Sequence, residues 1–125
     1  MLSGCQQGSS FAGLFSEDVK LSDRATQRWH YLIAGQWDGA YGFEPPAYRA
    51  AYSAEQFRSR YGSSVTWRSA KVNRVVIQPD GTTADIYVDL DYKFAMPGEG
   101  LVDRQQQLVE RWVKQEGEWW HIRKK

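Results

Sequence analysis

The sequence predicts an α+β protein in which N-terminal helices pack on a curved, four-stranded antiparallel sheet. Apolar residues recur every three or four positions in the first half of the chain and alternate with polar residues in the second half. The most regular stretch, residues 109–122, alternates, turns once at Glu116-Gly117 and alternates again, which predicts a tight hairpin. Because a lone hairpin leaves a face and an edge exposed, further strands and a covering layer of helices are expected.

Composition limits the classes of protein and site. The chain has 125 residues, 42% of them hydrophobic and 14% aromatic, which indicates one folded domain with its own core. Sixteen basic and fifteen acidic residues give a formal charge of +1, which argues against a nucleic-acid partner. One Cys excludes an internal disulfide, and His30 and His121 lack the spacing of zinc ligands, so no metal or cofactor is predicted.

The N-terminal segment contains the single cysteine. The tetrapeptide Leu2-Ser3-Gly4-Cys5 resembles a bacterial lipobox, and the polar, small residues after it are typical of a flexible tether. The resemblance implies a lipid on Cys5 and, with Gln6 next to it, a place on the periplasmic side of the outer membrane. Residues 1–15 would then be the start and tether, and residues 16–125 the domain. The alternative is a free cysteine in a cytoplasmic protein.

A first helix is predicted from residue 16, with Ser16 or Ser22 as N-cap and Gly35 at its end. Its apolar stripe is expected to face the sheet. That stripe consists of Leu21, Ala25, Trp29, Leu32 and Ile33.

Two shorter helices are predicted after Gly35. Residues 37–43 form the first, which Pro45-Pro46 ends because proline donates no backbone hydrogen bond. Ser53-Ala54-Glu55-Gln56 has the form of a capping box and opens the second, which Gly62 closes. The inward residues of this last helix are expected to be Phe57 and Tyr61.

Two long strands, residues 67–77 and 84–94, are predicted on either side of a turn at residues 79–82. The second strand alternates in the way that a sheet covered on one side requires. Its covered face would hold Ala84, Ile86, Val88, Leu90, Tyr92 and Phe94, and its solvent face Asp85, Tyr87, Asp89, Asp91 and Lys93. Opposite residues would be Ile77 and Ala84, Val75 and Ile86, Asn73 and Val88, and Arg74 and Tyr87.

Counting across Glu116-Gly117 gives the pairing of the last hairpin, which a loop at residues 97–100 joins to the preceding strand. Val113 is expected opposite Trp120, and Arg111 opposite Ile122. The valines suggest an inner face made of Val109, Arg111, Val113, Trp120 and Ile122. The outer face would then hold Leu108, Glu110, Trp112, Lys114, Trp119 and His121.

The order of elements resembles the nuclear transport factor 2-like fold, also called cystatin-like, which includes SnoaL-type cyclases and ketosteroid isomerases. The local resemblance rests on residues 34–41, on residues 46–49 and 53–57, and on the hairpin segments 110–113 and 117–120. It covers residues 16–125 and implies a conical sheet wrapped around helices, with a cavity at the open end. The same scaffold serves enzymes, ligand binders and interaction modules, so it implies no activity. No catalytic motif of its enzymes matches this sequence.

The ligand-binding candidates come from the expected cone. Arg111, on an otherwise apolar face, would anchor a carboxylate or form an internal salt bridge with Asp38, Glu44 or another helix carboxylate. Asn73 would hydrogen-bond a ligand or cap a β-bulge. Two further candidates, at the helix junction that carries the resemblance, are Trp37 and Tyr41.

Trp112, Trp119 and His121 are candidates for an interaction surface, because neighbouring exposed aromatic residues mark such surfaces. The alternative is that long basic side chains or the N-terminal segment cover them. The aspartates at positions 85, 89 and 91 are interpreted as a soluble face and not as catalytic acids.

The sequence favours a non-enzymatic, lipid-anchored domain of the cell envelope that binds a partner protein or a small hydrophobic or anionic ligand. The alternative is a small isomerase, dehydratase or cyclase that uses the cone. Arg111 would orient its substrate, and Tyr41, Asp38 or His30 would transfer the proton. A homodimer through packed sheet faces is a third hypothesis.

Overall fold

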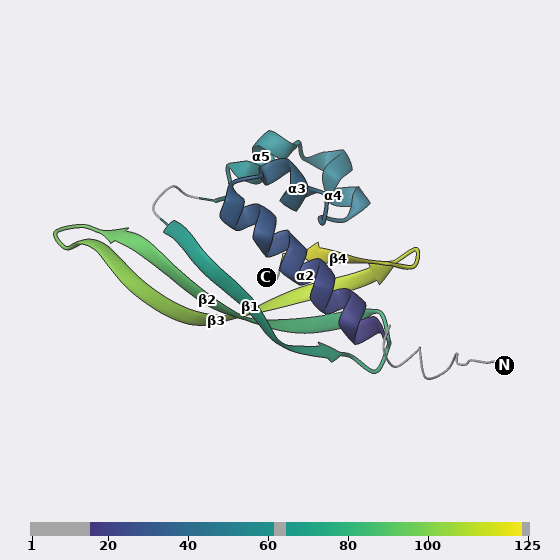
Figure 1. Ribbon diagram of the computed structural model, residues 1–125. Coiled ribbons are helices and arrows are strands. Elements are labelled where there is room, and N and C mark those ends of the chain that lie inside the picture. The colour runs from purple at the N-terminus through teal and green to yellow at the C-terminus, as the bar shows by residue number, and fades with distance from the viewer. Residues whose placement is uncertain (1–15, 62–64, 124–125) are drawn as a thin grey trace.

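The computed structural model describes residues 16–61 and 65–123. In this part of the chain a helical layer precedes one antiparallel sheet in the strand order β1-β2-β3-β4 (Figure 1). The predicted α+β class, with helices on a four-stranded antiparallel sheet, is confirmed. The elements are α2 (Glu17–Ala34), α3 (Trp37–Tyr41), α4 (Pro46–Ala51), α5 (Ala54–Arg58), β1 (Val65–Ile77), β2 (Thr83–Met96), β3 (Gly100–Gln115) and β4 (Glu118–Ile122).

Helix α2 begins and ends where its sequence predicts. The Ser16 hydroxyl accepts a hydrogen bond from the backbone N–H of Val19, and Gly35 ends the helix with a φ of 72°. The predicted stripe packs against the sheet, except that Ile33 is only half-buried and a charged residue joins the stripe. The buried residues of α2 are Leu21, Ala25, Arg28, Trp29 and Leu32.

The short helices α3, α4 and α5 lie together beside the C-terminal end of α2 (Figure 1). The capping box of α5 is confirmed, since Ser53 and Gln56 bond each other's backbone N–H. Helix α4 was not predicted: Pro46 occupies its first turn, where proline loses no hydrogen bond. The last helix ends at Arg58, with Ser59 as its C-cap, and not at Gly62 as predicted. Gly62 itself lies outside the described residues.

The predicted pairings within the sheet are mostly confirmed. Ile77 lies opposite Ala84, Val75 opposite Ile86, and Arg74 opposite Tyr87, as expected; Val113 and Arg111 lie opposite Trp120 and Ile122. The pairing of Asn73 with Val88 is wrong. A bulge between Val72 and Arg74 places Val72 opposite Val88 and leaves Asn73 as an extra, exposed residue.

The predicted faces of the last hairpin are wrong. Strand β3 pairs continuously with β2, so that Trp112 lies opposite Ala84 and Glu110 opposite Ile86. Opposite residues share a face, and Ala84 and Ile86 are buried, so Trp112 and Glu110 face the helices. Arg111 and the valines of the hairpin consequently lie on the other face.

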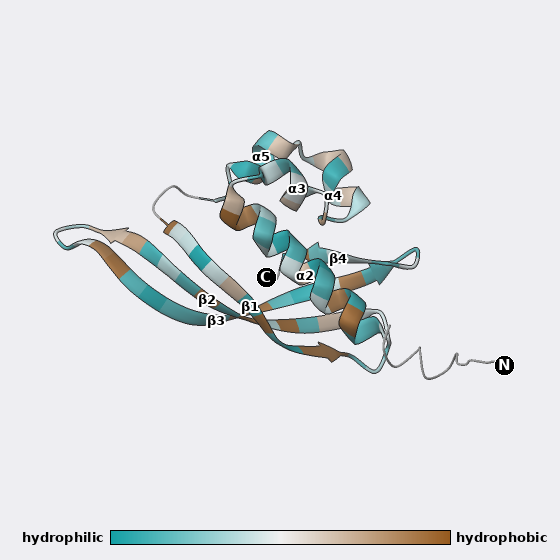
Figure 2. Cartoon of the chain, in the orientation of Figure 1, coloured by the Kyte–Doolittle hydropathy of each residue, from teal (hydrophilic) through white to brown (hydrophobic). Residues whose placement is uncertain are grey.

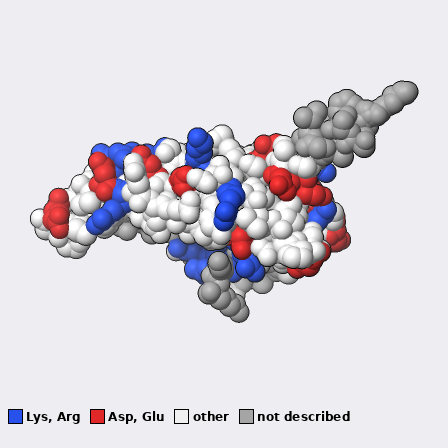
Figure 3. Space-filling view, turned by 90° about the horizontal axis from the view of Figure 1, so that it is seen from below, with Lys and Arg blue, Asp and Glu red and all other residues white. Residues whose placement is uncertain are grey.

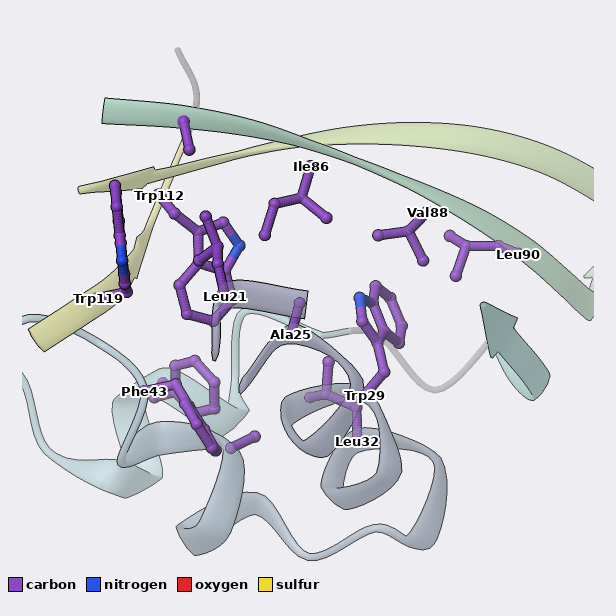
Figure 4. Packing of buried hydrophobic residues seen from close by; sticks show 13 residues of the cluster. Leu21, Ala25, Trp29, Leu32, Phe43, Ile86, Val88, Leu90, Trp112 and Trp119 are labelled. Atoms are coloured by element: carbon purple, nitrogen blue, oxygen red, sulfur yellow. The ribbon is translucent and has the colours of Figure 1, made fainter. Parts of the chain in front are cut away.

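The core lies between α2 and the inner face of the sheet, where the apolar positions of the two layers meet (Figure 2). Figure 4 shows Leu21, Ala25 and Trp29 of α2 facing Trp112, Ile86 and Val88 of the sheet. Aromatic edges join these layers: the rings of Trp29 and Trp67 are 5.2 Å apart, and those of Phe43 and Trp112 are 6.3 Å apart.

The opposite face of the sheet is polar, as predicted. Asp85 bonds Arg111, Asp89 bonds Asn73, and Asp91 bonds Arg68. The guanidinium of Arg74 lies 4.4 Å from the ring centroid of Tyr87. Acidic and basic groups are interspersed over the surface in Figure 3. A face with mixed charges of this kind is solvated by water.

Candidate functional site

Arg28 and Glu110 form an ion pair in the interior, between α2 and β3. The Nη1 of Arg28 donates to Oε2 of Glu110 at 2.9 Å, and the residues are 2% and 4% exposed. Two indole N–H groups donate further hydrogen bonds to this carboxylate: Trp29 donates to Oε2 at 2.9 Å, and Trp112 donates to Oε1 at 3.2 Å. Glu110 is therefore a fully bonded buried anion, held by groups from both layers.

Arg28 is less completely bonded than Glu110. Its Nη2 donates to the hydroxyl of Tyr61 at 2.9 Å, but its buried Nε–H has no acceptor among the described residues. A buried donor without an acceptor costs about 1–3 kcal/mol. An acceptor brought to this guanidinium would remove that cost.

His121 and Glu44 form a second buried polar pair beside the first. The Nδ1 of His121 lies 2.8 Å from Oε2 of Glu44, and the backbone N–H of His121 donates to the carbonyl of Phe43 at 2.8 Å. Arg60 lies 3.8 Å from the other oxygen of Glu44. Phe43 and Glu44, which follow α3 in the chain, thereby fix the orientation of the imidazole.

The protonation of this cluster follows from its burial. Burial and the nearby charge of Arg28 lower the pKa of His121, against the opposing effect of Glu44, so the ring is neutral near pH 7. Burial alone would lower the pKa of Arg28, but the combined attraction of Glu110, Tyr61 and Glu44 outweighs burial and raises this pKa. Burial also raises the pKa of Tyr61, which keeps its proton.

A cavity of about 250 Å³ adjoins both pairs. It lies where β4 ends, because Ile122 pairs with Arg111 and no described residue pairs with this edge of β3 beyond that point. Its wall combines aromatic and apolar side chains with three arginines and one glutamate, a formal excess of two positive charges. The lining residues are Arg28, Trp29, Tyr61, Trp67, Leu108, Val109, Glu110, Arg111, His121, Ile122 and Arg123.

Larger hollows lie on the surface, but their walls are mostly exposed. One of about 510 Å³ is lined by polar residues of the outer sheet face, including Lys71 and Gln105. Another, of about 580 Å³, lies between Gly35 and Arg58 at the short helices. Since neither contains a buried charged side chain, the cavity beside Arg28 is the better candidate site.

Of the four predicted ligand-binding residues, only Arg111 reaches this cavity. Its Nε donates to Asp85 at 2.8 Å, so the expected pairing with Asp38, Glu44 or another helix carboxylate is wrong. The carboxylate comes from the neighbouring strand because Arg111 faces away from the helices. Asn73 lies elsewhere, in its bulge, and donates to Asp89 at 2.9 Å.

The other two candidates belong to the helical layer. Trp37 packs against Tyr61, with ring centroids 5.2 Å apart. The hydroxyl of Tyr41 lies within hydrogen-bond distance of the carbonyls of Arg49 and Tyr52, which ties α3 to α4. The structure therefore does not bring the four candidates together.

Trp112, Trp119 and His121 do not form the predicted exposed surface, because they are 0%, 2% and 8% exposed. Trp119 packs on the helical layer and donates its indole N–H to Glu17 at 2.9 Å. His121 instead lines the cavity. Cys5, the predicted site of lipid attachment, lies outside the described residues.

Sequence reasoning missed Arg28, Glu44, Tyr61 and Glu110 as site residues. Arg28 follows Leu21 by seven positions and Ala25 by three, so it lies on the same helical stripe. The position of Arg28 on this apolar stripe was the one sequence signal of the site, since a charge on an apolar stripe needs a partner.

No protein-family model matches this chain, and no curated protein matches its sequence. Among residues 16–61 and 65–123, no group of three His, Cys, Asp or Glu side chains is placed to hold a metal ion. Within the same residues, no helix combines the length and hydrophobicity needed to cross a membrane.

Proposed function

We propose that this chain is a small-ligand-binding domain whose ligand is a compact organic anion with a flat apolar body. The observation that carries the proposal is the cavity at the end of β4, where a buried ion pair, a neutral histidine and two tryptophans converge. Binding sites typically combine an apolar wall with a few polar groups of this kind.

Arg28 would provide the charge that selects an anion. Glu110 and Tyr61 fix its guanidinium from two sides, so little side-chain entropy remains to be lost on binding. Arg111 and Arg123 add positive charge to the wall. A carboxylate is the best match, because it accepts charge-assisted hydrogen bonds from guanidinium groups.

The size and lining of the cavity restrict the rest of the ligand. Its volume of about 250 Å³ is below the usual range of roughly 300–1,000 Å³, which favours a ligand of one ring or a short branched chain. Trp29 and Trp67 meet edge to face at this wall and offer apolar area to such a ring.

Calorimetric titration with benzoate and benzamide tests the proposal, because the two probes share a ring and differ in charge. We expect benzoate to bind, and benzamide to bind about tenfold more weakly, since charge-assisted hydrogen bonds are about twice as strong as neutral ones. The L108W variant should lose benzoate binding, because Leu108 lines the cavity and a larger side chain would fill it. V19W is the matched control, since Val19 is exposed on α2 outside the cavity.

Equal affinities for the two probes, or unchanged benzoate binding by L108W, would contradict the proposal. Absence of heat with both probes, together with unchanged Tm of the protein in their presence, would mean that the ion pair serves folding alone.

An enzyme that transfers a proton is the second candidate, favoured by the His121–Glu44 pair. A neutral imidazole held by a carboxylate can accept a proton, and Arg28 could stabilise the resulting anion. This assignment replaces the earlier candidates: Tyr41 is bonded to backbone carbonyls, while His30 and Asp38 are exposed. Exchange of an acidic C–H for deuterium in a bound carboxylate, lost in H121Q, would support it; no exchange would contradict it.

We also propose the nuclear transport factor 2-like fold and a lipid anchor at Cys5. Helices on one face of a curved sheet support the first, and the tetrapeptide Leu2-Ser3-Gly4-Cys5 supports the second. Mass spectrometry of the chain produced in a bacterial host tests the anchor. A lipid on Cys5 with residues 1–4 removed is the expected result, and an unmodified Cys5 behind an intact Met1 would contradict it.

A further inference from the structure

One long edge of β3 has no neighbour in the described part of the chain. Strand β4 pairs only with the segment from Arg111 to Gln115, so residues 100–110 are bonded to β2 on one side alone. In Figure 1 this part of β3 forms the outer border of the sheet, where the β2–β3 hairpin extends beyond the helices. Unpaired strand edges are templates for further strands.

The backbone groups that face this edge can be identified. Lys114 donates its N–H to the carbonyl of Thr82 on β2 at 2.8 Å, so the backbone of Lys114 points toward β2. The side to which the backbone N–H and C=O groups point alternates from one residue of a strand to the next. The pairing of β2 with β3 shows no shift in register, so this alternation is unbroken along β3. The residues whose N–H and C=O point outward are therefore Leu101, Asp103, Gln105, Gln107 and Val109.

This edge lacks the usual protection against pairing. It contains neither proline nor lysine, and its two exposed charges, Asp103 and Arg104, cancel. Leu101 is 68% exposed, the most of any large hydrophobic residue in the described chain. Gln105, Gln106 and Gln107 are also exposed and offer amide groups to a neighbour.

We propose that β3 pairs with β3 of a second copy of this chain, antiparallel and with Gln105 opposite the partner's Gln105. In this register the outward-pointing residues of both copies meet one another, so every free N–H finds a carbonyl. Side chains match as well: Val102 meets the partner's Leu108 on the inner face, and Leu101 meets the partner's Val109 on the outer face. Polar residues fill the centre.

The neighbouring registers of the two β3 strands are less favourable than the one centred on Gln105. A two-fold axis at Asp103 or at Arg104 places like charges directly opposite one another, which is destabilising. An axis at Gln106 places Val102 opposite the partner's Glu110, whose carboxylate is already used inside the fold. The axis at Gln105 avoids both conflicts and buries the exposed leucine.

The pairing also reaches the cavity. Leu108 and Glu110 line the cavity at the point where β4 ends, and the partner's Val102 and the partner's Gly100 would lie opposite them. The second strand would thus extend the cavity wall on the side that β4 leaves open. The dimer stands independently of the ligand, since only the edge of β3 carries it.

Sedimentation of the chain over a wide concentration range tests the proposal. The wild type should form a dimer, and the Q105K and Q105E variants should each be monomers, because a like-charge pair would meet at the axis. An equimolar mixture of Q105K and Q105E should dimerise again, which no other register predicts. Circular dichroism checks that each variant folds, and since Gln105 is exposed we expect unchanged spectra.

T66K is the matched control, because Thr66 is exposed on β1 at the opposite edge of the sheet. It should leave the dimer intact. A wild type that is monomeric at all concentrations would overturn the proposal. A dimer that survives in Q105K, or that is lost in T66K, would also overturn it, since the interface would then lie elsewhere.

Discussion

Arg28 on α2 donates a hydrogen bond to Glu110 on β3 over 2.9 Å, and this pair joins the helical layer to the sheet inside the core. Both side chains are only about 3% exposed, so water does not compensate either charge. The indole N–H groups of Trp29 and Trp112 share the same carboxylate. Loss of either charge would strand the other in a low-dielectric interior.

E110Q should therefore lower the free energy of unfolding by about 3–5 kcal/mol, because it leaves Arg28 charged and unpaired. Urea denaturation measures the change. D85N is the matched control: it breaks the pair with Arg111, which is about one third exposed, and should cost at most about 1 kcal/mol. Equal losses of unfolding free energy in E110Q and D85N would mean that the buried pair stabilises the fold no more than the partly exposed one.

Stability should fall as the pH is lowered from about 6.5 toward 5. The pKa of His121 is below its ordinary value in the folded chain, so the unfolded chain binds more protons in this range. A higher proton uptake on unfolding means that acid favours the unfolded state, by at most about 1.4 kcal/mol per pH unit for one proton. Urea titrations at several pH values measure this slope.

H121Q should flatten this slope, because it removes the side chain whose pKa burial lowers. Carboxylates with lowered pKa, such as Glu17, affect stability only at more acidic pH. A slope that persists in H121Q would assign the proton uptake to another group.

G39A should destabilise the fold by about 1–3 kcal/mol. A methyl group at position 39 would approach the ring of Tyr31 to 2.4 Å, and that ring packs against Phe43. G42A is a milder control, because its nearest contact is the carbonyl of Gly39 at 3.3 Å. Thermal unfolding compares the two; a G39A variant as stable as the wild type would show that α3 shifts freely relative to α2.

The regular elements could be predicted from sequence because their signals are local. Ser16, the capping box at Ser53 and the turn at Glu116-Gly117 each determine structure within a few residues. Both turn residues have positive φ, 53° and 79°, as a two-residue hairpin requires. The hairpin pairing followed from that turn alone.

Local sequence did not determine which face of the β3–β4 hairpin points toward the helices. Val109, Val113 and Ile122 made the wrong face look apolar, while Glu110 and Lys114 made the buried face look polar. Counting from the loop between Met96 and Gly100 would have placed Trp112 beside Ala84 and corrected the faces. The site was missed for the same reason, since Glu110 belongs to a buried network that only the pairing of three strands reveals.

The most direct test of the ligand site is the shift of indole N–H signals in nuclear magnetic resonance spectra during titration with benzoate. Trp29 and Trp67 line the cavity, whereas Trp119 donates to Glu17 outside it. Benzoate should move the Trp29 and Trp67 signals and leave the Trp119 signal in place, and benzamide should move them less. Unmoved Trp29 and Trp67 signals at saturating benzoate would contradict the assignment of this cavity as the binding site.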